Sequence, residues 1–277
     1  MAEDFTSWIG RRITRRDVVT ERLLAEFRAT LHPFLFDSGN KDAPPGLHWA
    51  LAPATPVSTD LGLDGAEAKG LFLPPIPLPR RMWAGGSVET FAPLTLGQAV
   101  ERQSVIADIR HREGKSGSLC IVSITHEIAA AGRTILREKQ ELIFRGPGSA
   151  GKAGQPAPSE LGSGLTWQMP LTPILLFRFS AMTFNSHRIH YDQPYAVEAE
   201  GYAGLVVHGP LQASLLLNQA AVLLGKTPAH FEYRCLAPLI AGGTTELRTW
   251  IDGAQVKGVI LDSGGVPTCE ARSASER

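Results

Sequence analysis

Cysteine is scarce in this chain, and long apolar runs are absent from it. Three cysteines occur in 277 residues, Cys120, Cys235 and Cys269, with no CxxC pair and no even-numbered set, so we expect reduced thiols and no disulfide framework. No apolar run approaches the roughly 18 residues of a transmembrane helix. The acidic N-terminal stretch MAEDFTSWIG has no apolar signal core. The sequence therefore predicts a cytoplasmic protein with no membrane partner.

Excess charge of either sign is also absent. The 27 Lys and Arg residues balance 27 Asp and Glu residues, which gives a formal net charge of zero. Because sequence-independent affinity for nucleic acid depends on excess Lys and Arg, no nucleic-acid partner is expected. Local basic clusters are still sufficient for an anionic small ligand. With 43% hydrophobic and 19% charged residues, the chain has the composition of a globular protein with a sizeable core.

The segment 146–164 differs in composition from the rest of the chain. It reads GPGSAGKAGQPAPSELGSG, with no apolar periodicity, and is typical of a linker. We predict an N-terminal half at residues 1–147, a linker at 148–164 and a C-terminal half at 165–277.

The two halves carry related sequences. Residues 92–101 read APLTLGQAVE and residues 237–246 read APLIAGGTTE, which are identical at five of ten positions at a constant offset of 145. Strand-like residues follow both copies. Since the linker lies between the copies, a duplicated half is the better interpretation, and an accidental match is the alternative.

The pattern of apolar residues predicts similar elements in both halves. In the N-terminal half it predicts a helix over 17–31, with Asp17 as its cap, and several strands after residue 86. In the C-terminal half, PLQASLLLNQAAVLLG (210–225) is apolar on nearly every side, which is typical of a buried helix, and strands follow it. The expected fold class is α+β, with two curved antiparallel sheets that each surround a helix.

The offset of 145 relates this buried helix to residues 64–80, which read DGAEAKGLFLPPIPLPR. The segment contains Pro74, Pro75, Pro77 and Pro79. A proline in a helix interior costs about 3 kcal/mol, so a full helix is not expected here. We predict that the long central helix is intact only in the C-terminal half. The degenerate N-terminal half would then offer a groove that leads to the site described below.

Two stretches come close to known motifs but lack the residues that the chemistry requires. GPGSAGKA (146–153) departs from the phosphate-loop pattern at Ala153, which has no hydroxyl for Mg²⁺, and no helix is predicted after it. His187 and His190 have neither HExxH spacing nor a nearby Cys or Glu to complete a zinc site, so no metal is expected. The chain has no GxSxG motif and therefore no support for a serine hydrolase.

The stretches FNSHRIH (184–190) and VVHGPL (206–211) contain the candidate catalytic residues. His190 is a candidate base, since the unperturbed pKa of histidine, about 6.5, is close to neutral pH. Gly209 precedes a proline at the start of the buried helix. A free N–H there is suited to bind an oxygen that gains negative charge. Asn185 is placed to orient a water or a carbonyl group. The alternative is structural, with a buried histidine and an ordinary glycine-capped helix.

The sequence FSAMTFNSHRIHYDQPYA, followed by GLVVHGPLQASL, resembles the MaoC-like hydratases and dehydratases. Their motif runs Asp-x-Asn-Pro-x-His, and an apolar-His-Gly segment then opens the central helix of a hot-dog fold. The C-terminal half matches that module in length and order. The whole chain resembles the double hot-dog branch related to the dehydratase domain of fatty acid synthases. Within that branch it most resembles the mesaconyl-C4-CoA (3-methylfumaryl-CoA) and itaconyl-CoA hydratases.

The resemblance implies a role for each matching position. His190 aligns with the family's histidine, Gly209 with its oxyanion glycine and Asn185 with its catalytic aspartate. His187 and Arg188 stand where the family has Asn-Pro. Because an amide cannot exchange protons, His190 would carry the proton transfers while Asn185 positions the water. Whether His187 shares in proton transfer stays open.

The substrate-binding candidates are Arg80, Arg81, Trp83, His187, Arg188 and His208. In PRRMWAGG (79–86), Arg80 and Arg81 are candidates for the phosphates of CoA, and Trp83 for stacking on adenine. The alternative is a solvated arginine pair beside a buried tryptophan. Arg188 is a candidate for a carboxylate on the acyl group.

The resemblance implies a hydro-lyase that adds water reversibly to an α,β-unsaturated acyl-CoA. A branched C5 dicarboxylic acyl group, as in mesaconyl-C4-CoA or itaconyl-CoA, is the expected substrate. No metal or redox cofactor is expected, and CoA enters only as part of the substrate. Four alternatives stay open: a 3-hydroxyacyl-thioester dehydratase of fatty acid synthesis, a thioesterase, a non-catalytic acyl-thioester binding module and a purely structural tandem domain. The sequence does not choose between CoA and acyl carrier protein, and it leaves a homodimer open.

Overall fold

The computed structural model describes residues 5–114, 117–146 and 161–274. The strands are β1 (Arg12–Val18), β2 (Arg80–Thr90), β3 (Ala99–Gly114), β4 (Gly117–Ala130), β5 (Arg133–Arg145), β6 (Leu165–Pro170), β7 (His230–Cys235), β8 (Thr244–Asp252), β9 (Gln255–Leu261) and β10 (Pro267–Ala274). The α-helices are α1 (Glu21–Leu31), α2 (Pro173–Met182) and α3 (Gly209–Leu224). Most of the predicted linker and of the GPGSAGKA stretch lies outside the described residues. The domain boundaries at 147 and 165 therefore stay predictions.

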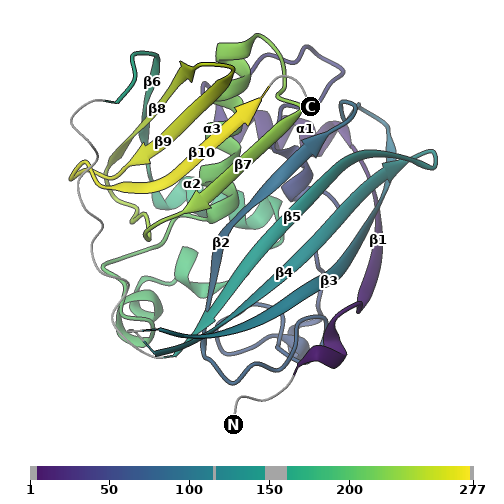
Figure 1. Cartoon of the computed structure of the whole chain (residues 1–277), viewed down its shortest axis with the longest axis vertical. Coiled ribbons are helices and arrows are strands. Elements are labelled where there is room, and N and C mark those ends of the chain that lie inside the picture. Colours follow the sequence, from purple (N-terminus) through teal and green to yellow (C-terminus); the bar gives the residue numbers. More distant parts are fainter. Residues whose placement is uncertain (1–4, 115–116, 147–160, 275–277) are drawn as a thin grey trace.

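These strands form one sheet in the order β1-β3-β4-β5-β2-β7-β10-β9-β8-β6. Each half contributes five strands, and β2 of the N-terminal half pairs with β7 of the C-terminal half in the middle. Figure 1 shows the two sets of strands side by side, with the helices behind the sheet. The strand order reads equivalently from either edge. The predicted α+β double hot-dog architecture is confirmed.

The central strand pair follows the offset found in the sequence. In the ladder between β2 and β7, Ser87 stands opposite Glu232, which is 145 residues further along the chain. The next equivalent strands begin at Ala99 in β3 and at Thr244 in β8, again 145 residues apart. An approximate twofold axis therefore passes close to the Ser87–Glu232 pair, as expected for a duplicated unit.

Helix α3 is buried on all sides. Every residue from Pro210 to Ala221 is buried, and the helix contacts β8, β9 and β10. Gly225 ends it with a φ of 68°, a left-handed conformation that glycine adopts without steric cost. The apolar pattern of residues 210–225 thus predicts this buried helix correctly.

Two amides on α3 join the helix to opposite halves of the molecule. The Asn218 Nδ2 donates to the carbonyl oxygen of Pro45 at 2.7 Å, and its Oδ1 accepts from the Phe36 N–H at 3.1 Å. The neighbouring Gln219 donates through Nε2 to the carbonyl oxygen of Leu247 at 3.1 Å. These bonds satisfy polar groups that burial would otherwise leave without water or a partner.

Helices α1 and α2 are equivalent and begin in the same way. The Thr20 side chain accepts from the N–H of Leu23, and the Thr172 side chain accepts from the N–H of Leu175, both at 3.1 Å. The predicted Asp17 cap is wrong, because Asp17 lies in β1. Its carboxylate instead accepts from two backbone N–H groups, those of Val18 at 2.8 Å and Ala52 at 2.7 Å.

Residues 61–79 occupy the place that α3 has in the other half, and they form no helix. The prolines keep this stretch irregular, but Leu73 and Ile76 still pack on the sheet against Ile106 and Phe144. A loop covers less of a sheet than a helix does. The middle of the concave face of β3, β4 and β5 is consequently left open.

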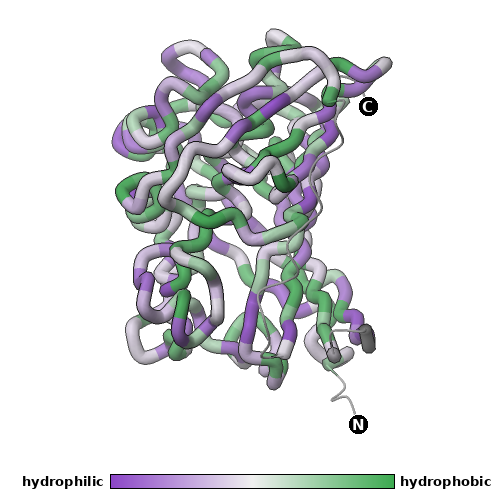
Figure 2. Tube along the Cα trace, turned by 90° about the vertical axis from the view of Figure 1, so that its left-hand side faces the viewer, coloured by the Kyte–Doolittle hydropathy of each residue, from purple (hydrophilic) through white to green (hydrophobic). Residues whose placement is uncertain are grey.

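Hydropathy alternates over short distances along the whole trace (Figure 2). Hydrophilic and hydrophobic positions follow one another in most strands, as expected for a sheet with one covered face. Among the described residues, the helices are all too short or too polar to cross a membrane.

Candidate active site

The stretch FNSHRIH follows α2 directly and folds into a compact turn. The N–H of Asn185 donates to the carbonyl oxygen of Ser180 at 2.8 Å, and the N–H of His187 donates to Asn185 Oδ1 at 3.1 Å. Arg188–His190 then form one turn of 3₁₀ helix. The rings of His187 and His190 meet edge to face with their centroids 5.6 Å apart. The turn thus brings the amide and both histidines together, as the sequence suggests.

His190 has the protonation state of a general base. Its Nδ1 lies 2.7 Å from the carbonyl oxygen of Val206. A carbonyl oxygen only accepts hydrogen bonds, so Nδ1 carries the proton and Nε2 keeps its lone pair. Burial, and to a lesser extent His187, lower the pKa of His190 to about 3. The imidazole is therefore neutral at pH 7, and its Nε2 lone pair can accept a hydrogen bond from a water.

The ring of His208 stacks on the ring of His190. The two rings stack with centroids 3.6 Å apart and an interplanar angle of 19°. His208 Nε2 lies 2.8 Å from the Ser180 hydroxyl, and burial lowers the pKa of His208 well below its usual value. The side chain is almost fully buried. His208 therefore packs on His190 and is not among the side chains that line the cleft described below, so this geometry does not support its predicted contact with substrate.

In the side-chain amide of Asn185 the oxygen is hydrogen-bonded, and the NH₂ group is left to donate. Its Oδ1 accepts from the N–H of His187, and only an oxygen can accept there. This fixes the orientation of the amide, so its NH₂ group is the part left to donate to a water or a substrate oxygen.

Gly209 lies at the start of α3, beside Trp83 of the other half. His208 is the N-cap and Gly209 the first helical residue, so the helix begins one residue earlier than the predicted start at Pro210. The N–H groups of a first helical turn have no intrahelical acceptor, so that of Gly209 is directed away from the helix ladder. A Cβ on Gly209 would lie 3.0 Å from Trp83 carbons. The close approach of the two halves therefore favours glycine here.

A cleft of about 1650 Å³ connects these residues with the N-terminal half. His190, Asn185, His187 and Gly209 line it from the C-terminal half, and Trp83 and Arg81 line it from β2. The Trp83 Nε1 donates to the hydroxyl of Tyr233 at 2.7 Å, which ties the indole to β7. The predicted position of the site between the halves agrees with this cleft.

Two of the predicted arginine contacts do not reach the cleft. Arg80 is buried, lies 3.5 Å from Glu200 and covers the ring of Tyr202. Arg188 pairs with Asp192 at 2.8 Å. Neither side chain is among those that line the cleft. Arg81 is the predicted arginine that does line it.

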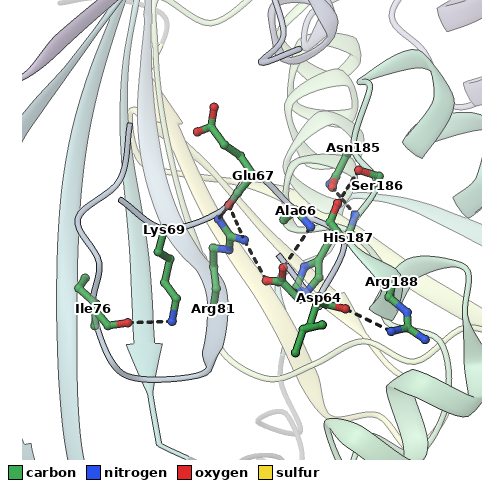
Figure 3. Close-up of polar contacts among 12 residues, drawn as sticks. Asp64, Ala66, Glu67, Lys69, Ile76, Arg81, Asn185, Ser186, His187 and Arg188 are labelled. Carbon is green, nitrogen blue, oxygen red and sulfur yellow. Dashed lines mark hydrogen bonds and ion pairs between the residues drawn. The ribbon is translucent and has the colours of Figure 1, made fainter. Parts of the chain in front are cut away.

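Asp64 and Glu200 are two carboxylates beside His187 that sequence analysis missed. Figure 3 shows the Asp64 carboxylate between Arg81 and His187. It pairs with Arg81 at 2.9 Å and lies 4.0 Å from His187 Nε2, while Glu200 Oε1 lies 3.5 Å from the same nitrogen. The one sequence signal for Asp64 is its position, because the offset of 145 relates it to Gly209. No sequence signal indicates Glu200.

The open concave face of the N-terminal half is polar where it borders the cleft. The lining side chains there are Arg15, Arg102, Ser104, His126 and Gln140. His126 bonds through both ring nitrogens, at 2.7 Å to the Ser104 hydroxyl and at 2.8 Å to Gln140 Oε1. Arg102 pairs with the buried Glu138 at 3.3 Å. The space left by the missing helix therefore has these polar side chains beside apolar ones such as Phe72, Ile124 and Leu142.

The described residues contain no group of three or more His, Cys, Asp and Glu side chains arranged to hold a metal ion. The nearest such collection, around His187, is a set of ion pairs with arginines.

Comparison with known protein sequences identifies the family of this chain. Residues 46–241 match the hydroxyacyl-thioester dehydratase type 2 family, Htd2. The chain belongs to this family. It is 41% identical over 244 residues to the mesaconyl-C(4)-CoA hydratase of Chloroflexus aurantiacus, with 85% of both chains covered. It is thus an enzyme of the acyl-CoA hydratase/dehydratase class.

Solved structures support the fold assignment. A MaoC-like dehydratase superposes with a TM-score of 0.72 and covers 98% of this chain and 99% of its own, at 14% identity. A Mycobacterium tuberculosis protein described as having a double hot-dog fold superposes with a TM-score of 0.60, also at 14% identity, covering 96% and 95%. At such identities the likeness concerns the fold.

Proposed function

We propose that this Htd2-family enzyme adds water reversibly to a branched C5 dicarboxylic acyl-CoA, such as mesaconyl-C4-CoA or itaconyl-CoA. The observation that carries the proposal is His190, a neutral buried histidine with a free Nε2 on a cleft shared by both halves. The 41% identity to a mesaconyl-C(4)-CoA hydratase supports the choice of acyl group.

The proposed reaction begins with deprotonation of water. His190 Nε2 takes a proton while the water oxygen bonds to the β-carbon of the enoyl thioester. The π electrons move towards the thioester carbonyl, and the resulting enolate oxygen accepts a hydrogen bond from the Gly209 N–H. The enolate then takes the proton from the His190 imidazolium at its α-carbon. Both protons of water end in the product, and the histidine returns to its neutral form.

Asn185 positions the water in this proposal. Its Oδ1 is held by the N–H of His187, which leaves the NH₂ group to donate. An amide that orients water without exchanging protons makes His190 the single base. The proposal uses no metal or redox cofactor.

Charged and polar side chains lie among the apolar ones that line the cleft, and they favour a short polar acyl group over a long fatty chain. Arg15, Arg102 and Gln140 line the part of the cleft that replaces the missing helix. Burying an alkyl chain against them would exclude water from charged and polar groups without replacing it, which is costly. This is the observation against the alternative, a dehydratase of fatty acid synthesis. Arg81 and Trp83 remain the candidates for the CoA moiety, and a cytoplasmic location remains a prediction.

A panel of enoyl-CoA thioesters tests the proposal. Mesaconyl-C4-CoA, itaconyl-CoA, crotonyl-CoA and a 2-decenoyl-CoA would each be incubated with the enzyme. The enoyl-thioester absorbance is followed for the conjugated substrates, and the hydration of itaconyl-CoA, whose double bond is not conjugated with its thioester, is followed by chromatography of the product. We expect rapid loss of absorbance with a dicarboxylic substrate and slow loss with the decenoyl thioester. Preference for decenoyl-CoA would favour the fatty-acid alternative. Release of free thiol would instead indicate a thioesterase, and absence of both turnover and binding would indicate a structural domain.

A further inference from the structure

A loop of the N-terminal half is attached directly to the turn that carries the catalytic candidates. The carbonyl oxygen of Asp64 accepts from the N–H of Arg188 at 2.8 Å, and that of Gly65 accepts from the Ser186 hydroxyl at 2.5 Å. Gly65 has a φ of +78°, and a Cβ there would collide with the carbonyl oxygen of Ser186. The loop therefore fits against the turn at backbone level.

Two carboxylates from different halves face the same nitrogen of His187. Glu200 Oε1 lies 3.5 Å from His187 Nε2, and Asp64 Oδ2 lies 4.0 Å from it (Figure 3 shows the Asp64 side). Each carboxylate is held by one of two consecutive arginines of β2: Glu200 by Arg80 at 3.5 Å and Asp64 by Arg81 at 2.9 Å. Two arginines and two carboxylates thus surround His187 in the order Arg80, Glu200, His187, Asp64, Arg81.

The Asp64 carboxylate is charged at neutral pH. Burial alone would raise the pKa of Asp64, but the neighbouring Arg81 guanidinium and, less strongly, His187 lower it below its usual value. An ionised carboxylate accepts hydrogen bonds and does not donate them. His187 Nε2 faces the oxygens of this carboxylate and of Glu200, and a ring nitrogen that faces acceptor oxygens is the one that carries a proton.

We propose that Asp64 is a positioning residue of the active site, which acts by fixing the ring orientation and the Nε2–H tautomer of His187 beside His190. The N-terminal half, which lacks a histidine base and an oxyanion glycine, would then still supply one functional side chain. That side chain stands at the position that the duplication relates to Gly209. The kinetic test rests on the proposed hydratase function, and the spectroscopic test does not.

The side chain of Asp64 can be changed without releasing the loop. The attachment uses the carbonyl oxygens of Asp64 and Gly65, so Asp64→Asn keeps it. The Asp64 carboxylate accepts from Arg81 at 2.9 Å and from the N–H of Ala66 at 3.1 Å, so the asparagine oxygen can keep one of these bonds, and the change removes the charge next to His187 together with the other bond. Asp60→Asn is the matched control. It lies in the same segment, and its carbonyl oxygen accepts from the N–H of Ala68 at 2.8 Å.

The kinetic test is a double-mutant cycle with His187→Ala. If Asp64 acts through His187, we expect Asp64→Asn to lower kcat/KM roughly tenfold in the wild-type background and less than about twofold in the His187→Ala background. Asp64→Glu should restore part of the loss, and Asp60→Asn should cause none. Equal losses in both backgrounds, or no loss in either, would overturn the proposal.

The spectroscopic test needs no substrate. Long-range ¹H–¹⁵N NMR of the imidazole nitrogens identifies the tautomer of each histidine, and the spectrum of His187→Ala assigns His187 by the missing signals. We expect an Nε2–H form in the wild type and in Asp60→Asn, and changed His187 nitrogen shifts in Asp64→Asn. Unchanged shifts would overturn the inference even if the enzyme hydrates acyl-CoA. Changed shifts in an enzyme that hydrates none of the panel would uphold it while the proposed function fails.

Discussion

The segment before the inner strand differs completely between the two halves. Residues 209–224 form a sixteen-residue helix that is buried on all sides, whereas residues 64–79 form an irregular loop with four prolines. Yet both lead into central strands that pair at the approximate twofold axis. The duplication thus kept the sheet and lost one helix.

The absence of this helix from the N-terminal half explains why the cleft extends over its sheet. An apolar helix is stable only where the sheet buries its faces, whereas a sheet can also be covered by a loop and its side chains. In the N-terminal half Leu73 and Ile76 cover one end of the concave face and polar side chains occupy its middle. Buried polar groups there bond to one another, as His126 does to Ser104 and Gln140. In the proposed mechanism one half therefore supplies the base and the helix N-terminus, and the other contributes space to the cleft.

The largest expected effect concerns His190 and His126, buried histidines of different halves that both line the cleft. His190 has one free ring nitrogen, whereas both ring nitrogens of His126 are bonded. We expect His190→Ala to lower kcat/KM roughly 10³-fold, because general base catalysis is worth about 10²–10⁴. His126→Gln should lower it less than about tenfold. Steady-state rates with the best acyl-CoA of the panel measure both, and a reversed ranking would exchange the roles of the halves.

A smaller effect is expected at the helix start that only one half has. In Gly209→Ala the new methyl group would lie 3.0 Å from Trp83 carbons, so either the indole or the first turn must shift. Removing a donor to an oxyanion costs about 10²–10³ in rate, and a displaced donor should cost somewhat less, roughly 30-fold in kcat.

Gly204→Ala is the matched control for this change. Its Cβ would meet Ile240 at 3.1 Å, in a contact as tight as that at Gly209 but not at the helix start. We expect its kcat to stay within about twofold of the wild type. A Gly209→Ala enzyme with unchanged kcat would remove Gly209 from the proposed mechanism.

Much of the fold could be predicted from the sequence, and the reason is periodicity. The apolar pattern placed α3 and the strands after residue 86, and the prolines excluded a helix at 64–80. The elements that sequence analysis missed are β1, β6 and α2. β1 and β6 are edge strands of seven and six residues, with little continuous burial. Asp17 was mistaken for a helix cap because an aspartate suits both a cap and a turn; its bond to Ala52 depends on tertiary structure.

The sequence indicates the site residues that lie in short stretches of the chain, but it does not indicate contacts between residues far apart in the sequence. Asn185, His190 and Gly209 belong to two short stretches with a recognisable order, and the structure brings them together at the cleft. Whether an arginine faces the cleft or an internal carboxylate depends on distant partners. Arg80 turns to Glu200, 120 residues away in the sequence, and no local pattern indicates this.

A stability difference should appear between the two amides of α3. Asn218 binds Pro45 and Phe36 of the N-terminal half, and Gln219 binds β8 of its own half. Replacing either residue by alanine leaves buried partners unsatisfied, which costs about 1–3 kcal/mol in the free energy of unfolding. Only Asn218→Ala should also speed amide exchange around residue 36. Faster exchange there in Gln219→Ala would show that α3 does not hold the halves separately.

The smallest expected effect is a pH dependence of stability that both halves share. Burial lowers the pKa of His48 and His126 in the N-terminal half, and of His190 and His208 in the C-terminal half. Each pKa returns to about 6.5 on unfolding, so below that pH the unfolded chain binds more protons and the folded state loses stability. Between pH 7 and pH 6 one such histidine accounts for ~0.7 kcal/mol.

Urea unfolding at these two pH values, compared between the wild type and His126→Gln, isolates the contribution of one histidine. The loss of unfolding free energy from pH 7 to pH 6 should be smaller by ~0.7 kcal/mol in the variant. His126 is the suitable choice, because His190 and His208 stack on each other and their protonation is therefore coupled. An equal loss in both proteins would mean that His126 is protonated in the folded state. The polar face of the N-terminal half would then carry an additional positive charge next to Arg102.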